Sequence, residues 1–274
     1  MYYRHNLDYT YPERSDAHMI IVKHLRDTNF DENYPYMEKG WWFNVKRAVL
    51  WVFLNLIVFP VCTIRYGLKI YGRENLKKHK AVFKDGAISV SNHVLIWDTL
   101  CVLKALRPRL YYCPVWATNF EGPNGPVIRW SGGIPVPTHS MRAMASFQRA
   151  IEQVLEEKNW LHFFPEGSMW YYYPDVRPIK KAAFKFAVRY NKPVLPITFS
   201  FRPRTGIYKL FGKAPLVDLH VGEPLFPDKS LPVLEAMDKL QAETYHVMQV
   251  MCGINPGDPT YNTDLNIDNY KKTM

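Results

Sequence analysis

The chain has 274 residues, of which 47% are hydrophobic, and its excess of Lys and Arg gives a net charge of +10 at pH 7. This length accommodates one large domain, or one domain with an appendage, and the hydrophobic content excludes a globally disordered chain. The positive charge favours an anionic partner, namely a phospholipid surface, a phosphorylated substrate or nucleic acid.

The first segment, residues 1–38, is predicted to be a polar lead-in. It is rich in Tyr, Asp and His, a composition that is not typical of a secretory signal peptide. Within it, Ser15 and Asp16 predict the cap of a short helix that ends at Arg26.

An apolar segment without charged side chains, AVLWVFLNLIVFPVCTI, follows at residues 48–64. A straight helix of this length, at about 1.5 Å per residue, falls short of the roughly 30 Å hydrocarbon core of a bilayer. Asn55 and Pro60 also disfavour a simple span. Basic residues flank the segment on both sides: Lys46, Arg47, Arg65, Lys69, Arg73, Lys77, Lys78 and Lys80.

We therefore predict a membrane-associated helical segment at residues 39–66. It would lie in one leaflet, or dip into it, with the flanking cations on phosphate headgroups. Two alternatives remain open at this point: a buried core helix, and a single membrane span. In a span, the denser basic flank would place the downstream domain on the cytoplasmic side.

From residue 67 to 253 the pattern alternates between strands and helices. The predicted strands are 68–71, 87–90, 110–115, 134–136, 160–164, 194–201 and 216–221. The predicted helices are 94–106, 140–157 (capped by Ser140), 180–190 and 231–252. This alternation predicts an α/β domain with a mixed, largely parallel sheet flanked by helices, followed by a C-terminal tail at 254–274.

The first chemical motif is N-H-x-x-x-x-D, in which His93 and Asp98 follow the predicted strand 87–90. The unperturbed pKa of His, about 6.5, lets it take up and return a proton near neutral pH. A carboxylate bonded to one ring nitrogen would fix the tautomer and leave the other nitrogen free to accept a proton. The alternative is a capping or surface histidine beside a solvated carboxylate.

The second motif is F-P-E-G-S, in which Glu166, Gly167 and Ser168 follow the predicted strand 160–164. Gly167 would let a ligand or another backbone segment approach closely, although an ordinary strand-to-loop turn has the same composition. Functional loops of α/β sheets lie beyond the carboxyl ends of the strands. We therefore expect His93 and Glu166 to face a common cleft.

Together, N-H-x-x-x-x-D and F-P-E-G-S resemble the glycerolipid acyltransferase family, whose best-known members are the 1-acylglycerol-3-phosphate acyltransferases. The resemblance covers residues 68–225. The segments 133–136, 180–184 and 194–197 are similar to further blocks of that family. The family also typically has a membrane-binding helical segment before its first block.

The resemblance implies an acyltransferase of phospholipid biosynthesis. His93 would be the general base that removes the proton from the hydroxyl of a lysophospholipid such as 1-acylglycerol-3-phosphate, and Asp98 would orient the imidazole. The hydroxyl would attack the thioester of acyl-CoA or of an acyl carrier protein. Backbone N–H groups near Val94 or Gly133 would stabilise the oxyanion.

The other implied site residues bind the acceptor headgroup: Glu166, Gly167, Ser168 and Lys181. The expected partners are membrane lipids and the acyl donor, and nucleic acid is not expected. No cofactor and no metal are expected, because the histidines and the four cysteines show no metal-ligand spacing. The cysteines are expected to be free thiols in a reducing cytosol.

The sequence departs from the family where arginines often bind the acceptor phosphate. Pro137 follows the second block, and Met169 follows Ser168. Substitutes for these arginines are available nearby: Arg142, Arg177, Lys180 and Lys181. Otherwise the acceptor is a different lipid, or the protein is a non-catalytic membrane or anionic-lipid binding protein with degenerate motifs.

Overall fold

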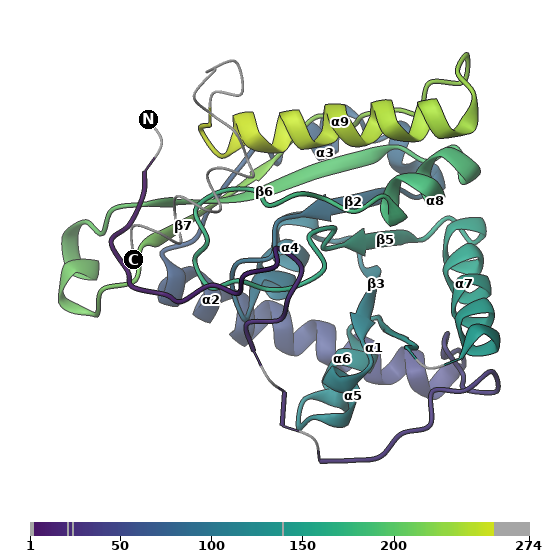
Figure 1. The fold of residues 1–274 in the computed structure, drawn as a ribbon. Helices are drawn as coiled ribbons and strands as arrows, with labels where there is room; N and C mark the ends of the chain where they lie inside the picture. Colours follow the sequence, from purple (N-terminus) through teal and green to yellow (C-terminus); the bar gives the residue numbers. More distant parts are fainter. Residues whose placement is uncertain (1–2, 21, 24, 139, 255–274) are drawn as a thin grey trace.

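The structure is a computed structural model, and it describes residues 3–20, 22–23, 25–138 and 140–254. All but the first residue of the predicted tail, 254–274, lies outside the described residues. The described strands form a seven-stranded sheet in the order β1-β7-β6-β2-β5-β3-β4 (Figure 1). The strands are β1 Lys69–Tyr71, β2 Ile88–Ser91, β3 Tyr111–Trp116, β4 Gly133–Val136, β5 Trp160–Phe163, β6 Val194–Arg202 and β7 Leu216–Val221.

The sheet is mixed and largely parallel, as predicted. β6 and β7 pair antiparallel, and the other neighbouring strands pair parallel. β2, β5 and β3 are therefore parallel to one another, and their carboxyl ends share one edge of the sheet. The loops that carry both chemical motifs leave from this edge.

Helices cover both faces of the sheet. The longer ones are α4 Asp98–Leu106, α7 Met141–Glu156, α8 Ala182–Tyr190 and α9 Val233–Met251. Side chains of α7, α8 and α9 contribute to one hydrophobic core, and side chains of α4 and of the helix before β1 contribute to the second. Five short elements were not predicted: α3 Asn75–Lys78, η2 Val82–Asp85, α5 Thr118–Glu121, α6 Gly125–Trp130 and η3 Gly206–Leu210.

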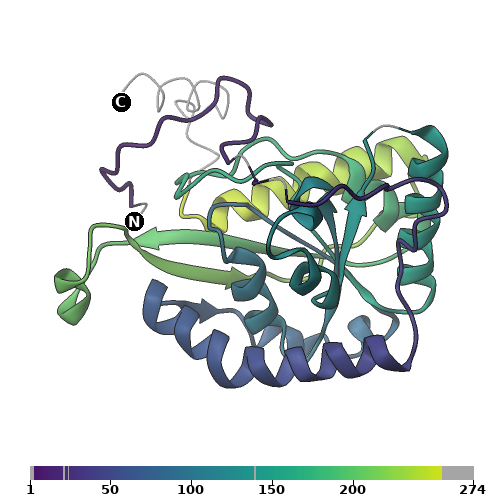
Figure 2. The ribbon, with the colours of Figure 1, turned by 90° about the horizontal axis from the view of Figure 1, so that it is seen from below.

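The apolar segment forms one continuous helix of 26 residues, Trp41–Tyr66, that lies along one side of the domain (Figure 2). It consists of α1 Trp41–Phe53, a π-helical turn η1 Leu54–Val58, and α2 Phe59–Tyr66. Its length and composition would suffice to cross a membrane, and only 17% of its most apolar window is buried. A buried core helix is therefore excluded.

The predicted helix between Ser15 and Arg26 is wrong for the described residues, which form turns and irregular structure. Long-range hydrogen bonds explain the difference. The carbonyl of Ser15 accepts from the Arg177 guanidinium, and the carbonyl of Ala17 accepts from the Trp170 indole. These carbonyls bind distant side chains and are not used in helical i→i+4 bonds.

The helix predicted to begin at Val94 begins at Asp98 instead. The carbonyls of His93 and Val94 accept from the backbone N–H groups of Trp170 and Tyr172. Residues 94–97 therefore form a turn, which is pinned to the loop after β5. This arrangement holds both motif loops together.

Candidate functional site

His93 and Asp98 form a hydrogen-bonded pair at the carboxyl end of β2. The Nδ1 atom of His93 bonds to Oδ2 of Asp98. The carboxylate is buried and also accepts from the backbone N–H groups of Val94 at 3.2 Å and Thr99 at 2.7 Å. Asp98 is therefore fixed in place, and the neutral ring carries its proton on Nδ1.

The imidazole of His93 is held in one orientation. Phe164 stacks on it with ring centroids 4.1 Å apart and an interplanar angle of 21°. The His93 side chain remains 25% exposed. With Nδ1 bonded to the carboxylate, Nε2 is the ring nitrogen that can accept a proton from a ligand.

Glu166 joins the loop after β5 to the loop after β2. Its Oε2 accepts from the backbone N–H of His93 at 3.0 Å, and its Oε1 accepts from the backbone N–H of Arg177 at 2.8 Å. The structure thus brings His93 and Glu166 together at one edge of the sheet. The carboxylate itself is buried, so it acts on the site by holding the backbone of His93.

Arg177 is the buried partner of Glu166, an arrangement that the sequence analysis did not anticipate. Its guanidinium forms an ion pair with Oε2 of Glu166 at 2.7 Å and donates to the Ser168 hydroxyl at 2.8 Å. It also lies 4.4 Å from the centre of the Trp170 ring. Arg177 is fully buried and is not available for an acceptor phosphate. A carboxylate inside an apolar motif is a signal for such a buried cation.

The two lysines after this loop lie in different places. Gly167 has φ +84°, a backbone conformation that favours glycine, and a Cβ at this position would lie 2.9 Å from Nζ of Lys180, at the flexible end of that side chain. Lys180 also pairs with Asp16 at 3.1 Å. Lys181 instead pairs with Asp238 on α9, so the structure does not place it with the other predicted site residues.

The N-terminal segment borders the site. His18 stacks on Trp116, at the end of β3, with ring centroids 4.1 Å apart. Burial lowers the pKa of His18, and the charge of His93 lowers it further, so the two imidazoles lie close enough to interact. No local pattern in the sequence could have indicated this long-range approach.

The backbone donor predicted at Val94 is already used, because this N–H donates to Asp98. Gly133 lies in β4, at the outer edge of the sheet, and β5 and β3 lie between β4 and β2. Among the residues that the structure describes, no cluster of three His, Cys, Asp or Glu side chains could hold a metal ion.

The comparisons with known proteins point to one family. Residues 67–200 match the Acyltransferase family. Human 1-acyl-sn-glycerol-3-phosphate acyltransferase beta is 28% identical over 137 residues, which are 49% of this chain and 48% of the human protein. The chain therefore matches about half the length of this curated relative. The solved 1-acyl-sn-glycerophosphate acyltransferase of Thermotoga maritima is 18% identical with a TM-score of 0.42, over 76% of this chain and 97% of that one.

Proposed function

We propose that this protein, whose residues 67–200 match the Acyltransferase family, transfers a fatty acyl group from a thioester to the hydroxyl of a lysophospholipid. The acceptor class follows from the human relative, which is a 1-acyl-sn-glycerol-3-phosphate acyltransferase. The observation that carries the proposal is the His93–Asp98 pair, in which Nε2 of a partly exposed imidazole can accept a proton.

In the proposed reaction, Nε2 of His93 takes the proton from the acceptor hydroxyl as its oxygen attacks the thioester carbonyl carbon. Asp98 stabilises the imidazolium that forms. The tetrahedral intermediate then expels the thiolate, the C–S bond breaks, and the imidazolium returns the proton to the sulfur. The products are an ester and a free thiol, and no acyl-enzyme is needed.

Glu166 and Ser168 act on this chemistry indirectly, through the position of the loop. Both side chains are bonded to Arg177, so they position the loop and the backbone of His93. Lys180 lies against Gly167 and is the nearer candidate for an acceptor phosphate. The predicted role of Lys181 would require it to leave Asp238.

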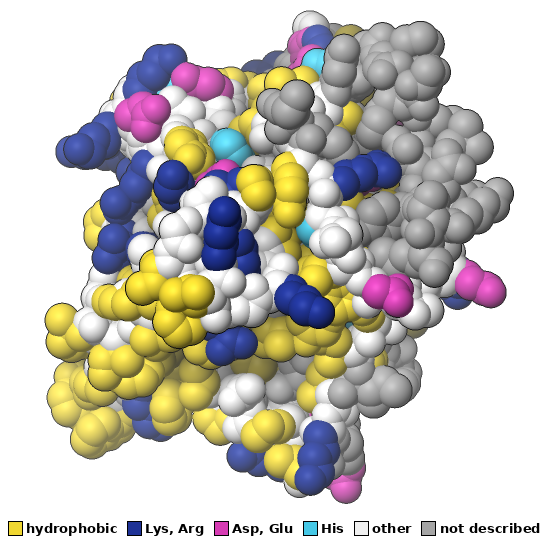
Figure 3. All heavy atoms as spheres, turned by 90° about the vertical axis from the view of Figure 1, so that its left-hand side faces the viewer, with side chains coloured by type: hydrophobic (Ala, Val, Ile, Leu, Met, Phe, Trp, Pro, Cys, Tyr) yellow, Lys and Arg dark blue, Asp and Glu magenta, His cyan; other side chains and the backbone are white. Residues whose placement is uncertain are grey.

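The helix Trp41–Tyr66 is proposed to lie flat on a lipid surface. Phe43 near its start and Tyr66 at its end are both buried against the domain, so a spanning orientation would need to detach one of them. The opposite side of the helix is apolar and exposed: Trp41, Trp42, Val49, Val52, Phe53, Leu56, Ile57, Val61 and Ile64. Figure 3 shows hydrophobic side chains gathered low on one face of the molecule, with Lys and Arg side chains beside them. The location of the catalytic domain on the cytoplasmic side of the membrane remains a prediction.

The test is the variant His93→Ala, assayed by the release of free thiol with 1-acylglycerol-3-phosphate as acceptor. Acyl-CoA and acyl carrier protein are supplied in separate reactions, which also identifies the donor. We expect thiol release to fall by at least about 100-fold, the typical contribution of a general base. The matched control is His79→Ala, because His79 lies beside Glu223 at the opposite edge of the sheet.

Undiminished thiol release by a folded His93→Ala protein would refute the mechanism. The second candidate function is lipid binding without catalysis, favoured by the two missing family arginines. It predicts vesicle binding by the unaltered protein without thiol release from either donor, across a panel of lysolipid acceptors.

A further inference from the structure

A groove runs along the flank of helix Trp41–Tyr66. It consists of two adjoining hollows of about 560 Å³ and 400 Å³, which share Asn55 and Arg107. Arg107 follows α4 and precedes β3, whereas His93 follows β2. Because β2 and β3 point the same way, the groove lies at the amino-end edge of these strands, and the acyl-transfer site lies at the other edge.

Three cations line this groove, namely Arg73, Lys104 and Arg107, and Arg109 lies two residues beyond Arg107 in the chain. Among the described residues, none of them forms an ion pair with an Asp or Glu side chain. Burial lowers the pKa of Arg107 and of Arg109, and the positive charge of Arg73 lowers both further. The cluster therefore concentrates positive charge without a neighbouring carboxylate, and this favours the binding of an anion.

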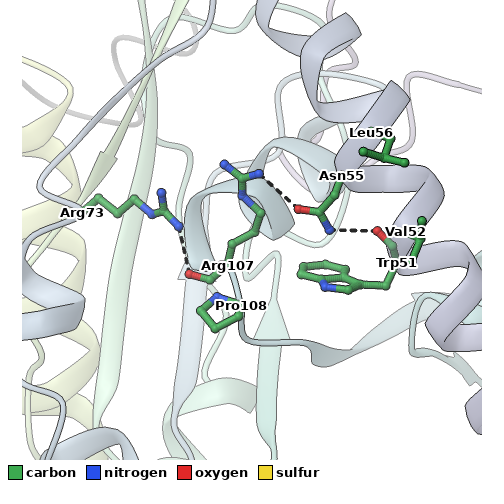
Figure 4. A pocket seen from close by; sticks show the side chains of 7 residues that line it. All are labelled: Trp51, Val52, Asn55, Leu56, Arg73, Arg107 and Pro108. Atoms are coloured by element: carbon green, nitrogen blue, oxygen red, sulfur yellow. Dashed lines mark hydrogen bonds between the residues drawn. The ribbon is translucent and has the colours of Figure 1, made fainter.

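The two arginines that line the larger hollow are held in place by neutral groups. Arg107 donates to the Asn55 side chain at 3.1 Å, and Asn55 donates to the Trp51 carbonyl at 2.8 Å (Figure 4). Arg73 donates to the carbonyls of Arg107 at 2.9 Å and Ala105 at 3.1 Å. These bonds orient the guanidinium groups without neutralising them.

The other wall of the groove is apolar and belongs to the proposed membrane helix. Val52 and Leu56 are 57% and 71% exposed and lie beside Asn55 (Figure 4). Asn55 itself lies in the π-helical turn, a distortion that is frequent at functional sites. The groove therefore combines guanidinium donors with an apolar surface that continues along the helix.

We propose that this groove binds an anionic membrane phospholipid, with Arg73 and Arg107 on the phosphate oxygens and the acyl chains along Val52 and Leu56. Guanidinium groups bind phosphate oxygens in a bidentate geometry, and the adjoining helix places the lipid tails in the leaflet. The proposal rests on the proposed contact of the helix with a lipid surface and is independent of acyl transfer.

The test compares sedimentation of the full chain with two kinds of vesicle: phosphatidylcholine alone, and phosphatidylcholine with phosphatidylglycerol as the minor component. We expect the double variant Arg73→Gln, Arg107→Gln to lose about 30-fold in affinity for the anionic vesicles, because each cation near the surface contributes about 1 kcal/mol. Its affinity for phosphatidylcholine vesicles, set by the apolar face, should not change.

The matched control is Lys185→Gln, Lys229→Gln, which removes two exposed charges on the α8 and α9 side of the molecule. Its preference for anionic vesicles should remain close to that of the unaltered protein. An equal loss in the control, or an undiminished preference in the arginine variant, would overturn the proposal.

A measurement on the unaltered protein covers the case in which the arginine variant fails to fold. Dihexanoyl phosphatidylglycerol, below its micelle concentration, should raise the Tm more than dihexanoyl phosphatidylcholine does. An equal rise with inorganic phosphate would indicate a free-phosphate site and overturn the lipid proposal, as would no rise with the anionic lipid.

The proposed lipid groove and the proposed acyl transfer can be refuted independently of each other. The arginine variant should release thiol normally in detergent micelles, where the bilayer is not needed. His93→Ala should lose thiol release and keep its preference for anionic vesicles.

Discussion

At the scale of single residues, the site depends on two buried carboxylates with different surroundings. Asp98 accepts hydrogen bonds from the His93 ring and from backbone N–H groups, whereas Glu166 is paired with the buried guanidinium of Arg177. Removing one partner of a buried pair leaves an uncompensated charge, which typically costs about 3–5 kcal/mol. The Glu166–Arg177 pair therefore holds the loop geometry on which the exposed His93 imidazole depends.

His162 is a fully buried imidazole, unlike His93, and its environment makes stability depend on pH. Its ring bonds to the hydroxyls of Ser89 at 2.9 Å and Ser91 at 3.3 Å. Burial lowers its pKa from 6.5 to about 3, and the charge of His93 contributes to the shift. The unfolded chain therefore binds a proton at His162 below pH 6.5, whereas the folded chain stays neutral there until about pH 3.

We expect the variant His162→Asn to be less stable than the unaltered protein above pH 6.5, where the stabilisation by the neutral ring is fully present. As the pH falls from 6.5 toward 3, proton binding to His162 in the unfolded chain lowers the unfolding free energy of the unaltered protein by up to about 1.4 kcal/mol per pH unit. The variant lacks this proton-binding group, so its unfolding free energy is not lowered in this way. The difference in unfolding free energy between the two proteins should therefore shrink. Urea unfolding at several pH values within this window measures it, and a constant difference would contradict the assignment.

The sequence predicted the chemistry of individual residues better than their contacts. His93, Asp98 and Glu166 stand in short motifs whose spacing is visible in the chain. The contacts of Arg177 with Ser15 and of His18 with Trp116 join segments that are distant in sequence. Such contacts leave no periodic or capping signal, and this is why the N-terminal segment was predicted as a helix and its place beside the site was missed.

At the scale of elements, boundaries set by local caps were predicted closely. Ser140 was predicted to cap the helix 140–157, and the structure has α7 at Met141–Glu156 with the Ser140 side chain accepting from the N–H of Ala143 at 3.3 Å. The start of α4 was four residues off because distant backbone groups of the loop after β5 bind the carbonyls before it. Elements that depend on tertiary hydrogen bonds are thus the ones that pattern and propensity predict least well.

We expect Ser140→Ala to lower the unfolding free energy by about 1 kcal/mol, because the N–H of Ala143 loses its acceptor at the helix start. Ser140→Asn should retain nearly all of the stability, since Asn is an equally good cap. Urea denaturation of both variants and the unaltered protein measures the effect. A loss of equal size in the Asn variant would show that the side chain acts through packing and not through capping.

At the scale of the whole molecule, the fold class could be predicted but the arrangement of strands could not. Alternating elements indicated an α/β domain, and the sheet confirms this. The short strand β1 pairs with β7, which lies at the other end of the domain sequence, and β7 runs antiparallel to β6. The order of strands is set by which hydrophobic faces the helices bury, and this is a property of the assembled core and not of any one segment.

The orientation of the helix Trp41–Tyr66 relative to a bilayer decides how His93 reaches its substrates. Both ends of the helix are packed against the domain, so a flat orientation keeps the domain intact at the lipid surface. The four native thiols are buried, so a cysteine introduced at an exposed position can be labelled selectively. Three positions along the helix suit this experiment, with exposed fractions of 65% at Val49, 71% at Leu56 and 69% at Ile64.

We expect environment-sensitive dyes at Val49→Cys, Leu56→Cys and Ile64→Cys to be quenched alike by brominated lipids, at a shallow depth of about 5–10 Å below the headgroups. In a spanning helix, the sites at 49 and 64 would differ in depth by about 22 Å, at 1.5 Å per residue. The control is Leu234→Cys on α9, which is exposed on the other side of the sheet and should not be quenched. Equal shallow quenching would place the catalytic domain beside the membrane surface, which holds the lipid acceptor. A graded depth would instead mean that the helix leaves the domain.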